Sequence, residues 1–513
     1  MQTGKERRFF MKQKRVSGIL LHPTSLPGPY GLGSLGSEAY RFIDFLSGAG
    51  QSIWQILPLG PTGYGDSPYS AFSAFAGNPL LICPERLVER GDLDPADLAG
   101  VRMPEGEAHF GFVQGFLGRL LHKGAACFER QGAGARRAAY ERFCSEQAYW
   151  LNDYAIFQAL RSHFEHRSWN EWPEEIRCRR DSALHFWGEE LAATIRVHKY
   201  AQFVFFEQWF ALRDYAASRG VRILGDLPIF VALDSADVWA NQHLFHLNEE
   251  GRPLLVAGVP PDYFSTTGQR WGNPLYRWEA MAEEGYAWWL SRFRWNLAQT
   301  DLVRIDHFRG FEACWAIPAE EKTAVNGQWL KVPGAELFRA LKAALGRVPI
   351  IAEDLGLITP EVEALRREFG FPGMKILQFA FGSGADNPYL PHNLESDCVV
   401  YTGTHDNDTT LGWWRKLSGQ EREGVRAYLG SSGRDQPWEL IRAALASVGA
   451  YCIIPLQDLL ALGSEARMNT PGRAGGNWGW RFSPGDLGVD LQQRLSALTA
   501  LYGRHLRPPE NGP

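Results

Sequence analysis

The sequence predicts an α/β protein built as a (β/α)8 TIM barrel, with large insertions after the second and third strands. Eight short, nearly continuous apolar runs recur along the chain, separated by segments whose apolar residues have helical spacing. Strands of this kind belong to parallel sheets that are buried on both faces, as in a (β/α)8 barrel. Several runs also end in acidic side chains, and in such barrels the strand ends form the active-site face.

The barrel is predicted to begin after a basic N-terminal segment. The first fifteen residues carry six Lys and Arg side chains, with only Phe9 and Phe10 as large apolar neighbours. No apolar stretch follows these charges, as a secretory signal would require. We therefore expect residues 1–16 to be a disordered basic arm, with Met1 and Met11 as alternative starts, and residues 17–513 to form the barrel.

The first two strands and the helix between them establish the α/β alternation. Residues 18–22 are an apolar run ended by Pro23, and a loop rich in Gly, Pro and Ser then leads to a helix that starts at Ser37 or Glu38. Residues 53–58 form the second strand. Strand, loop, helix and strand in this order is the start of a parallel α/β fold.

Two insertions interrupt the alternation. Much of 113–220 has helical periodicity, for example 146–161 and 198–218. Because a structureless loop of such length is uncommon in a compact domain, we predict a mostly helical inserted subdomain at about 60–220. A second inserted subdomain, with the composition of loops, is predicted at about 228–290.

Six further apolar runs complete the predicted barrel. Each has the length of a buried strand and is bounded by turn residues or by a helical segment. They cover residues 221–226, 302–306, 348–353, 374–379, 398–402 and 450–455.

Composition and charge exclude several classes of protein. The chain has 45% hydrophobic and 22% charged residues and a net charge of −5, so it favours neither nucleic acid nor an anionic membrane as a partner. No apolar run approaches the roughly 18 residues that span a bilayer. Seven cysteines are scattered without a Cys-x-x-Cys pair, which favours reduced thiols over a zinc site or disulfides. We expect a soluble, cytoplasmic protein.

Arg304 and Asp306 are two residues apart on the predicted fourth strand, so their side chains share one face. A buried cation beside a carboxylate keeps the carboxylate ionised, and an ionised carboxylate at the end of a barrel strand is a candidate nucleophile. A purely structural ion pair is the alternative.

Four strand ends carry acidic side chains that a barrel would bring to one mouth. They are Asp226, Asp306, Glu353 and the pair His405-Asp406. Unpaired buried carboxylates are costly, so an all-structural explanation of the four is disfavoured. Two uses are then open, namely metal binding and acid/base or nucleophilic chemistry.

Metal-dependent hydrolysis would need oxygen and nitrogen ligands at this mouth. The candidates are His405, Asp406 and Asp408 with Asp306 and Glu353. Arg304 would place a cation beside the metal, and no His-x-His pair supplies nitrogen ligands. This alternative is the weaker one, and we predict neither a metal nor another cofactor.

Glycosyl transfer uses the same carboxylates in a different way. A retaining enzyme needs an ionised nucleophile and a carboxylic acid of raised pKa about 5 to 5.5 Å apart. Asp306 beside Arg304 suits the first role, and Glu353 on the adjacent strand suits the second because adjacent strands lie about 4.8 Å apart. Sugar rings also stack on aromatic side chains, and the sequence places several in loops: Tyr64, Tyr69, Phe264, Trp271 and Trp478.

Four short motifs of the chain resemble those of the α-amylase superfamily. They are Gly225-Asp226, Arg304-Ile305-Asp306, Glu353-Asp354-Leu355-Gly356 and Thr404-His405-Asp406-Asn407. Three further stretches narrow the resemblance to the 4-α-glucanotransferases known as amylomaltases or disproportionating enzymes: residues 18–27, Ser67-Pro68-Tyr69-Ser70 and the loop 260–274. The resemblance runs from about Ser17 to the end of the chain.

This resemblance implies roles for individual residues. Asp306 would be the nucleophile, Glu353 the acid/base and Asp406 the transition-state stabiliser that binds hydroxyls of the donor sugar. Arg304, His405, Asp226 and Tyr69 would lie around the same sugar, and Trp271, Asp262 and Gln269 would belong to a loop that covers the acceptor side and helps to exclude water. The remaining substrate-binding candidates are Tyr64, Ser67, Phe264, Phe379 and Asn477.

One departure separates the chain from true amylases. Their third-strand motif carries an Asn-His pair linked to calcium and sugar contacts, whereas Asp226 is followed here by Leu227-Pro228-Ile229. The resemblance therefore implies a calcium-independent transferase whose partners are α-1,4-glucan donors and acceptors. The alternatives are an α-glucan hydrolase with the same three carboxylates and a noncatalytic glycan-binding protein, which would need no nucleophile.

Overall fold

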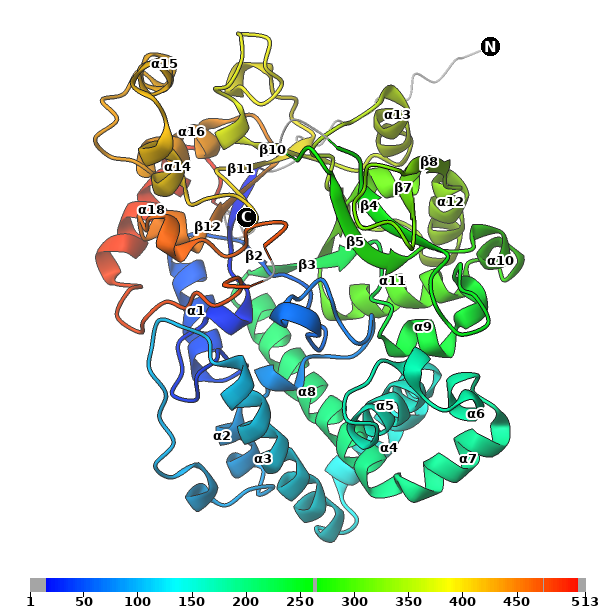
Figure 1. Ribbon diagram of the computed structural model, residues 1–513. Helices are drawn as coiled ribbons and strands as arrows, with labels where there is room; N and C mark the ends of the chain where they lie inside the picture. The colour runs from blue at the N-terminus through cyan, green and yellow to red at the C-terminus, as the bar shows by residue number, and fades with distance from the viewer. Residues whose placement is uncertain (1–14, 262–264, 474, 506–513) are drawn as a thin grey trace, which may run out of the picture.

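The computed structural model describes residues 15–261, 265–473 and 475–505 and contains a (β/α)8 barrel (Figure 1). Eight parallel strands form one sheet in the order β10-β11-β12-β1-β2-β3-β6-β9. The Ala352 amide donates a hydrogen bond of 2.9 Å to Pro372 O, which joins β9 to the chain entering β10 and so closes the barrel. The predicted fold class is confirmed.

All eight predicted runs are strands of this sheet, with ends that differ by a few residues. They are β1 (Val16–Leu20), β2 (Ile53–Gln55), β3 (Arg222–Pro228), β6 (Leu302–Asp306), β9 (Ile350–Ala352), β10 (Gly373–Ile376), β11 (Cys398–Tyr401) and β12 (Tyr451–Pro455). The first strand begins at Val16, inside the predicted arm, and Arg15 donates a hydrogen bond of 2.8 Å to Leu445 O. Residues 1–14 of that arm lie outside the described part of the chain.

Side chains of the barrel strands alternate between two apolar cores. In β6, Val303 and Ile305 pack outward with the surrounding helices, whereas Leu302 packs in the barrel interior with residues of the other strands. Successive strand residues point to opposite faces, so interior layers of large apolar side chains fill the barrel below its mouth.

Helices surround the barrel and fill the segment between β2 and β3 (Figure 1). The helices predicted near residue 37, at 146–161 and at 198–218 are all present. Within the described residues the helices are α1 (Ser37–Gly48), α2 (Pro84–Glu89), α3 (Phe110–Arg130), α4 (Ala135–Glu146), α5 (Ala148–His163), α6 (Glu174–Arg177), α7 (Asp181–Glu190), α8 (Ala192–Ser218), α9 (Ala236–Ala240), α10 (Trp278–Glu283), α11 (Ala287–Gln299), α12 (Gly334–Leu345), α13 (Pro360–Phe369), α14 (Thr410–Lys416), α15 (Gly419–Leu429), α16 (Trp438–Ala446), α17 (Leu456–Leu459) and α18 (Val489–Leu501). No helix in this part of the chain is long and apolar enough to cross a membrane.

A second, antiparallel sheet lies beside the barrel and was not predicted. Its strands have the order β5-β4-β7-β8, with β4 (Leu255–Val259) and β5 (Gln269–Pro274) from the segment after β3 and β7 (Ala313–Pro318) and β8 (Gln328–Lys331) from the segment after β6. The segment expected to consist of loops therefore contributes two strands. Figure 1 shows this sheet at the upper right, opposite α14, α15 and α16.

Candidate active site

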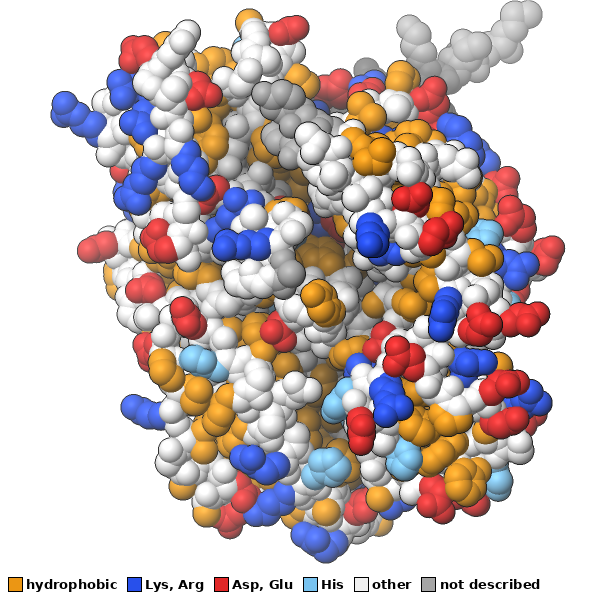
Figure 2. Space-filling model, viewed as in Figure 1, with side chains coloured by type: hydrophobic (Ala, Val, Ile, Leu, Met, Phe, Trp, Pro, Cys, Tyr) orange, Lys and Arg blue, Asp and Glu red, His pale blue; other side chains and the backbone are white. Residues whose placement is uncertain are grey.

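The C-terminal ends of the barrel strands bring the predicted acidic side chains to one mouth. Leu302 of β6 faces the barrel interior, so Arg304 and Asp306 follow on the same face. Leu224 of β3 and Ile351 of β9 also face the interior. Two residues further along, Asp226 near the end of β3 and Glu353 just beyond β9 therefore face the same way. Figure 2 shows this side of the molecule hollowed near its centre, between the region of α14–α16 and the second sheet.

Arg304 lies between two carboxylates. Its Nη1 donates to Asp226 Oδ1 at 2.8 Å and Oδ2 at 2.6 Å, and its Nη2 donates to Asp306 Oδ1 at 2.8 Å. Burial alone would lower the pKa of Arg304, but the charges of the two carboxylates raise it well above its usual value, so the guanidinium stays charged. The Asp226 side chain is fully buried and that of Asp306 is 29% exposed. Of these two carboxylates, only Asp306 is accessible from the mouth.

Glu353 lies next to Asp306 across the sheet and has a different environment. Ile305 pairs with Ala352, and the Glu353 amide donates to Ile305 O at 3.0 Å. Asp306 and Glu353, each one residue further along, therefore lie side by side. The Glu353 carboxylate accepts hydrogen bonds from the amides of His307 at 2.7 Å and Leu355 at 2.9 Å. Burial raises the pKa of Glu353 to about 7, with Arg304 opposing the shift and Asp306 adding to it.

The turn after β6 contacts both Asp306 and Glu353. His307 has φ 52°, in the left-handed region that non-glycine residues seldom adopt. This conformation directs its amide to Glu353 and is the kind of local strain that accumulates at functional sites. Burial lowers the pKa of His307 to about 4, so its ring is neutral and adds no positive charge beside Asp306.

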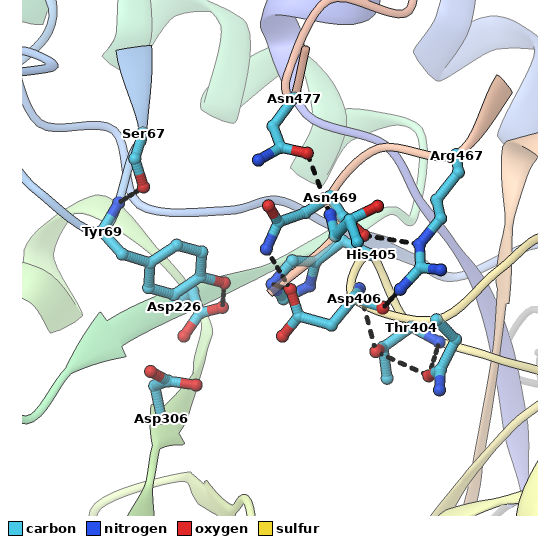
Figure 3. A network of polar contacts seen from close by, with 12 residues as sticks. Ser67, Tyr69, Asp226, Asp306, Thr404, His405, Asp406, Arg467, Asn469 and Asn477 are labelled. Atoms are coloured by element: carbon cyan, nitrogen blue, oxygen red, sulfur yellow. Dashed lines mark hydrogen bonds and ion pairs between the residues drawn. The ribbon is translucent and has the colours of Figure 1, made fainter. Parts of the chain in front are cut away.

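Tyr69 connects the loop after β2 to the buried acid of β3 (Figure 3). Its hydroxyl donates to Asp226 Oδ2 at 2.7 Å, and its amide donates to Ser67 Oγ at 3.2 Å. Burial and the neighbouring Asp226 raise the pKa of Tyr69 well above its usual value, so the phenol remains a donor. Its ring stacks on His405, with centroids 5.3 Å apart and planes at 11°. Tyr64, in contrast, is 79% exposed on a turn earlier in the same loop.

His405 and Asp406 follow β11 on a loop. His405 is buried, whereas the Asp406 side chain is 42% exposed, with His405 Nε2 3.4 Å from Asp406 Oδ1. Asp406 Oδ1 accepts a hydrogen bond of 2.6 Å from Asn469 Nδ2, and Asp406 O accepts one of 2.6 Å from Arg467. Figure 3 shows the second carboxylate oxygen of Asp406 on the side of Asp226 and Asp306.

The second sheet brings Gln269 and Trp271 to the mouth. Trp271 is 38% exposed, and its Nε1 donates to Gln269 Oε1 at 3.2 Å. Its ring contacts the His307 ring edge to face, with centroids 4.8 Å apart, so the second sheet contacts the turn after β6. Asp262 and Phe264 belong to the same loop region but lie outside the described residues.

Two predicted contact residues lie in segments that follow barrel strands. Phe379, just after β10, is 40% exposed and meets Tyr389 edge to face. Asn477 bonds within its own loop, accepting from the Thr470 amide at 3.0 Å and donating to Arg473 O at 2.8 Å.

The metal alternative finds no support in the arrangement of ligands. Asp408 Oδ2 accepts hydrogen bonds from Lys416 at 2.5 Å and Ser464 at 2.8 Å, so this carboxylate serves a surface contact. Arg304 already pairs with Asp306. In the described ranges no group of three or more His, Cys, Asp or Glu side chains is arranged to hold a metal ion.

Sequence reasoning missed residues that hold the site from outside the strands. These are Arg467 and Asn469, which contact Asp406. Trp478, which the sequence did indicate as a loop aromatic, packs against Tyr69 and His405 with ring centroids 6.0 Å away from each. Arg467 and Asn469 lie in a segment without periodicity, so no pattern marks them. Their only signal is their position after the eighth strand, at the same end of the barrel as the acids.

Comparison with known proteins places the chain among enzymes. A family model described as 4-alpha-glucanotransferase matches residues 21–487, which include every strand of the barrel except the first. The chain belongs to the 4-alpha-glucanotransferase family. The family expected from the sequence motifs is thereby confirmed.

Members of the 4-alpha-glucanotransferase family align with nearly the whole chain. The 4-alpha-glucanotransferase of Thermus thermophilus is 51% identical over 95% of this chain and 99% of its own length, and that of Synechocystis is 51% identical over 97% and 99%. Among solved structures, the amylomaltase of Streptococcus agalactiae in complex with acarbose is 38% identical, has a TM-score of 0.93 and covers 96% of this chain and 100% of its own.

Proposed function

We propose that this member of the 4-alpha-glucanotransferase family moves α-1,4-glucan segments from a donor maltooligosaccharide to the 4-hydroxyl of an acceptor glucan or glucose, with retention of configuration. The observation that carries the proposal is the pair of acids at adjacent strand ends. Asp306 is partly exposed and bonded to a cation, whereas burial holds the pKa of Glu353 at about 7. A retaining mechanism needs this combination of an ionised and a protonated acid.

The proposed reaction has two steps. Glu353 gives its proton to the glycosidic oxygen while Asp306 attacks the anomeric carbon, so the C–O bond to the leaving sugar breaks and an Asp306–glucan ester forms. The 4-hydroxyl of the acceptor then attacks the same carbon, returns its proton to Glu353 and frees Asp306. Two inversions give retention, and the chemistry calls for no cofactor.

The other groups at the mouth would bind the donor sugar. Asp406, with one carboxylate oxygen on the side of Asp226 and Asp306, is proposed to bind hydroxyls that shift during formation of the oxocarbenium-like transition state. Arg304, His405, Asp226 and Tyr69 would fix the same sugar, since they form one contact network around Asp306.

The second sheet and the loops would bind the glucan on either side of the cleaved bond. Trp271 offers an exposed ring face beside the acids, and its partner Gln269 offers an amide. The proposal extends to the other predicted contact residues Tyr64, Ser67, Phe379 and Asn477, and to Asp262 and Phe264 outside the described ranges.

The same carboxylates would also serve an α-glucan hydrolase, so the choice of transfer rests on further support. Transfer requires an acceptor site that excludes water, and Trp271 packed on the turn after Asp306 suits such a site. Relatives at 51% identity are named glucanotransferases. A noncatalytic glycan-binding protein is disfavoured because it would not need a protonated Glu353 beside Asp306.

We propose a reducing compartment, the cytoplasm, as the place of action. All seven cysteines are free thiols, as is usual for proteins of reducing compartments. The proposed partners are α-1,4-glucan donors and acceptors alone, without nucleic acid or membrane.

Incubation with maltotriose tests the proposed function. The expected result is glucose plus a ladder of longer maltooligosaccharides while the number of reducing ends stays constant. A rise in reducing ends without longer products would indicate a hydrolase. No change in the sugars, with acarbose still bound, would favour the glycan-binding alternative.

A further inference from the structure

The Asp406 carboxylate depends on a neighbouring segment for its orientation. Asp406 lies on a loop beyond the end of β11, and its side chain is 42% exposed. One carboxylate oxygen accepts the hydrogen bond of 2.6 Å from Asn469 Nδ2, and Figure 3 shows the other on the open side, toward Asp226 and Asp306. His405 Nε2 lies 3.4 Å from the first of these oxygens, which is a longer contact than that of Asn469. Without the Asn469 hydrogen bond, the exposed carboxylate would keep only this longer contact and would sample several rotamers.

The segment that carries Asn469 is fixed by contacts that do not use the Asn469 side chain. Arg467 donates from Nη2 to Asp406 O at 2.6 Å and from Nε to Asn469 O at 2.7 Å. The Asn469 amide donates to His405 O at 3.0 Å, and the Thr470 amide donates to Asn477 Oδ1 at 3.0 Å. The loops that follow the neighbouring strands β11 and β12 are thus joined by a backbone hydrogen bond and by the Arg467 guanidinium. The Asn469 side chain is left to act on the carboxylate alone.

The chemistry of the amide suits this contact. A neutral donor fixes one oxygen of Asp406 without cancelling its negative charge, whereas a Lys or Arg in the same place would form an ion pair and draw the charge away from a ligand. The sequence offers no pattern that assigns Asn469 a role.

We infer that Asn469 is a positioning residue for Asp406. Its amide holds one carboxylate oxygen so that the other meets the hydroxyls of the donor sugar. The inference rests on the proposed function, in which Asp406 binds that sugar most strongly in the transition state. Groups that orient metal-binding side chains by hydrogen bonds contribute about 10- to 100-fold to activity, and we take the same scale for a group that orients a carboxylate. Misplacement of a functional group by about an ångström is costly.

The test compares Asn469→Ala and Asn469→Asp with a matched control. Asn241→Asp is the control because Asn241 Nδ2 also donates one hydrogen bond, of 2.9 Å, to Asp237 O on α9, outside the proposed site. Asn469→Ala should lower kcat for maltotriose about 10- to 100-fold with a smaller change in KM and a nearly unchanged Tm. Asn469→Asp should be more severe, because it sets a second carboxylate against Asp406. Asn241→Asp should keep wild-type kcat.

A double-mutant cycle separates positioning from a structural tie. Binding of acarbose is measured by calorimetry in the wild type, Asn469→Ala, Asp406→Asn and the double variant. If Asn469 acts through Asp406, Asn469→Ala weakens binding in the wild type and not in the Asp406→Asn background. Equal weakening in both backgrounds, or wild-type kcat in Asn469→Ala, would overturn the inference.

The same experiment distinguishes failure of the inference from failure of its premise. Full activity of Asp406→Asn would remove the proposed role of Asp406 itself, and the inference with it. Inactive Asp406→Asn together with fully active Asn469→Ala would leave the proposed function intact and reject the positioning role alone.

Discussion

Arg304 Nη2 lies 2.8 Å from Asp306 Oδ1, and the other terminal nitrogen of the same guanidinium holds both oxygens of Asp226. Arg304 is thus held by the buried carboxylate of Asp226 and in turn orients the accessible carboxylate of Asp306. Arginine suits this position because its planar fork presents separate donors to two partners, which a lysine ammonium cannot do with the same geometry. A change at Arg304 should therefore affect both the reactivity of Asp306 and the stability of the barrel around Asp226.

Replacement of Asp306 by Asn should abolish transfer while leaving the protein folded. The amide keeps the size of the side chain and can still accept from Arg304, but it is not a nucleophile. We expect kcat for maltotriose to fall by about 10⁴-fold or more, with Tm changed by only a few degrees. Residual activity above a few per cent of wild type would show that another group attacks the sugar.

Replacement of Arg304 by Met should cost both activity and stability. It leaves the Asp226 carboxylate buried without its cation, and loss of one partner of a buried ion pair costs about 3–5 kcal/mol. Arg304→Lys should be more stable than Arg304→Met, because it keeps a positive charge beside Asp226. Its kcat should still be strongly reduced, because one ammonium cannot orient both carboxylates. Urea unfolding and maltotriose kinetics measure the two effects.

Arg504 supplies the control for Arg304. It is fully buried near the start of β1, where it donates to Val16 O at 3.0 Å and Leu445 O at 2.7 Å. Arg504→Lys should lower stability and keep kcat, since the N-terminal face of such barrels serves stability. Equal loss of kcat in Arg304→Lys and Arg504→Lys would mean that the first acts only through folding.

Activity should decrease as pH rises through about 7. In the proposed mechanism Glu353 acts as an acid, which it can do only while protonated. Burial, opposed by Arg304 and aided by Asp306, raises its pKa to about 7. The kcat/KM for maltotriose, measured from pH 5 to 9, should therefore fall on its alkaline side near that value. A profile that stays flat to pH 9 would contradict the assignment of Glu353 as the acid.

The unfolding free energy should depend on pH because of the same proton on Glu353. In the unfolded chain a glutamate has a pKa of about 4.3, so between about 4.3 and 7 the folded state holds a proton that the unfolded state has released. The stabilisation by this proton is complete below about 4.3 and is lost as pH rises through about 7. Glu353→Gln should flatten the decrease of unfolding free energy across that window, and an unchanged slope would place the pKa of Glu353 elsewhere.

Removal of the Trp271 ring should increase hydrolysis relative to transfer. The ring covers the turn after Asp306, and its loss would admit water and weaken acceptor binding. For Trp271→Ala we expect more reducing ends per transfer event and a higher KM for glucose as acceptor. Trp329→Ala is the control, because Trp329 is similarly exposed on the same sheet but packs on Arg309, with 3.8 Å from the guanidinium carbon to the ring centroid. An unchanged product ratio in Trp271→Ala would remove it from the acceptor side.

The amino-acid sequence by itself determined the barrel and the acids at its mouth. Buried parallel strands are continuous apolar runs, and side chains two apart share a face, so Arg304 and Asp306 were predictable as neighbours. The barrel rule that strand ends converge gave Asp226 and Glu353 as further members of the site. These inferences need only the spacing of residues along each strand and the general rule for this type of barrel.

Only the tertiary structure decided what lies around those acids. The second sheet joins strands from two separate segments, and antiparallel pairing between distant segments leaves little local signal. The contact of Asn469 with Asp406 spans 63 positions between loops without periodicity. The pKa of Glu353 depends on burial, which is a property of the assembled barrel. Local pattern therefore determined which strands and acids the chain has, whereas packing between distant segments determined the orientation of these acids and the raised pKa of Glu353.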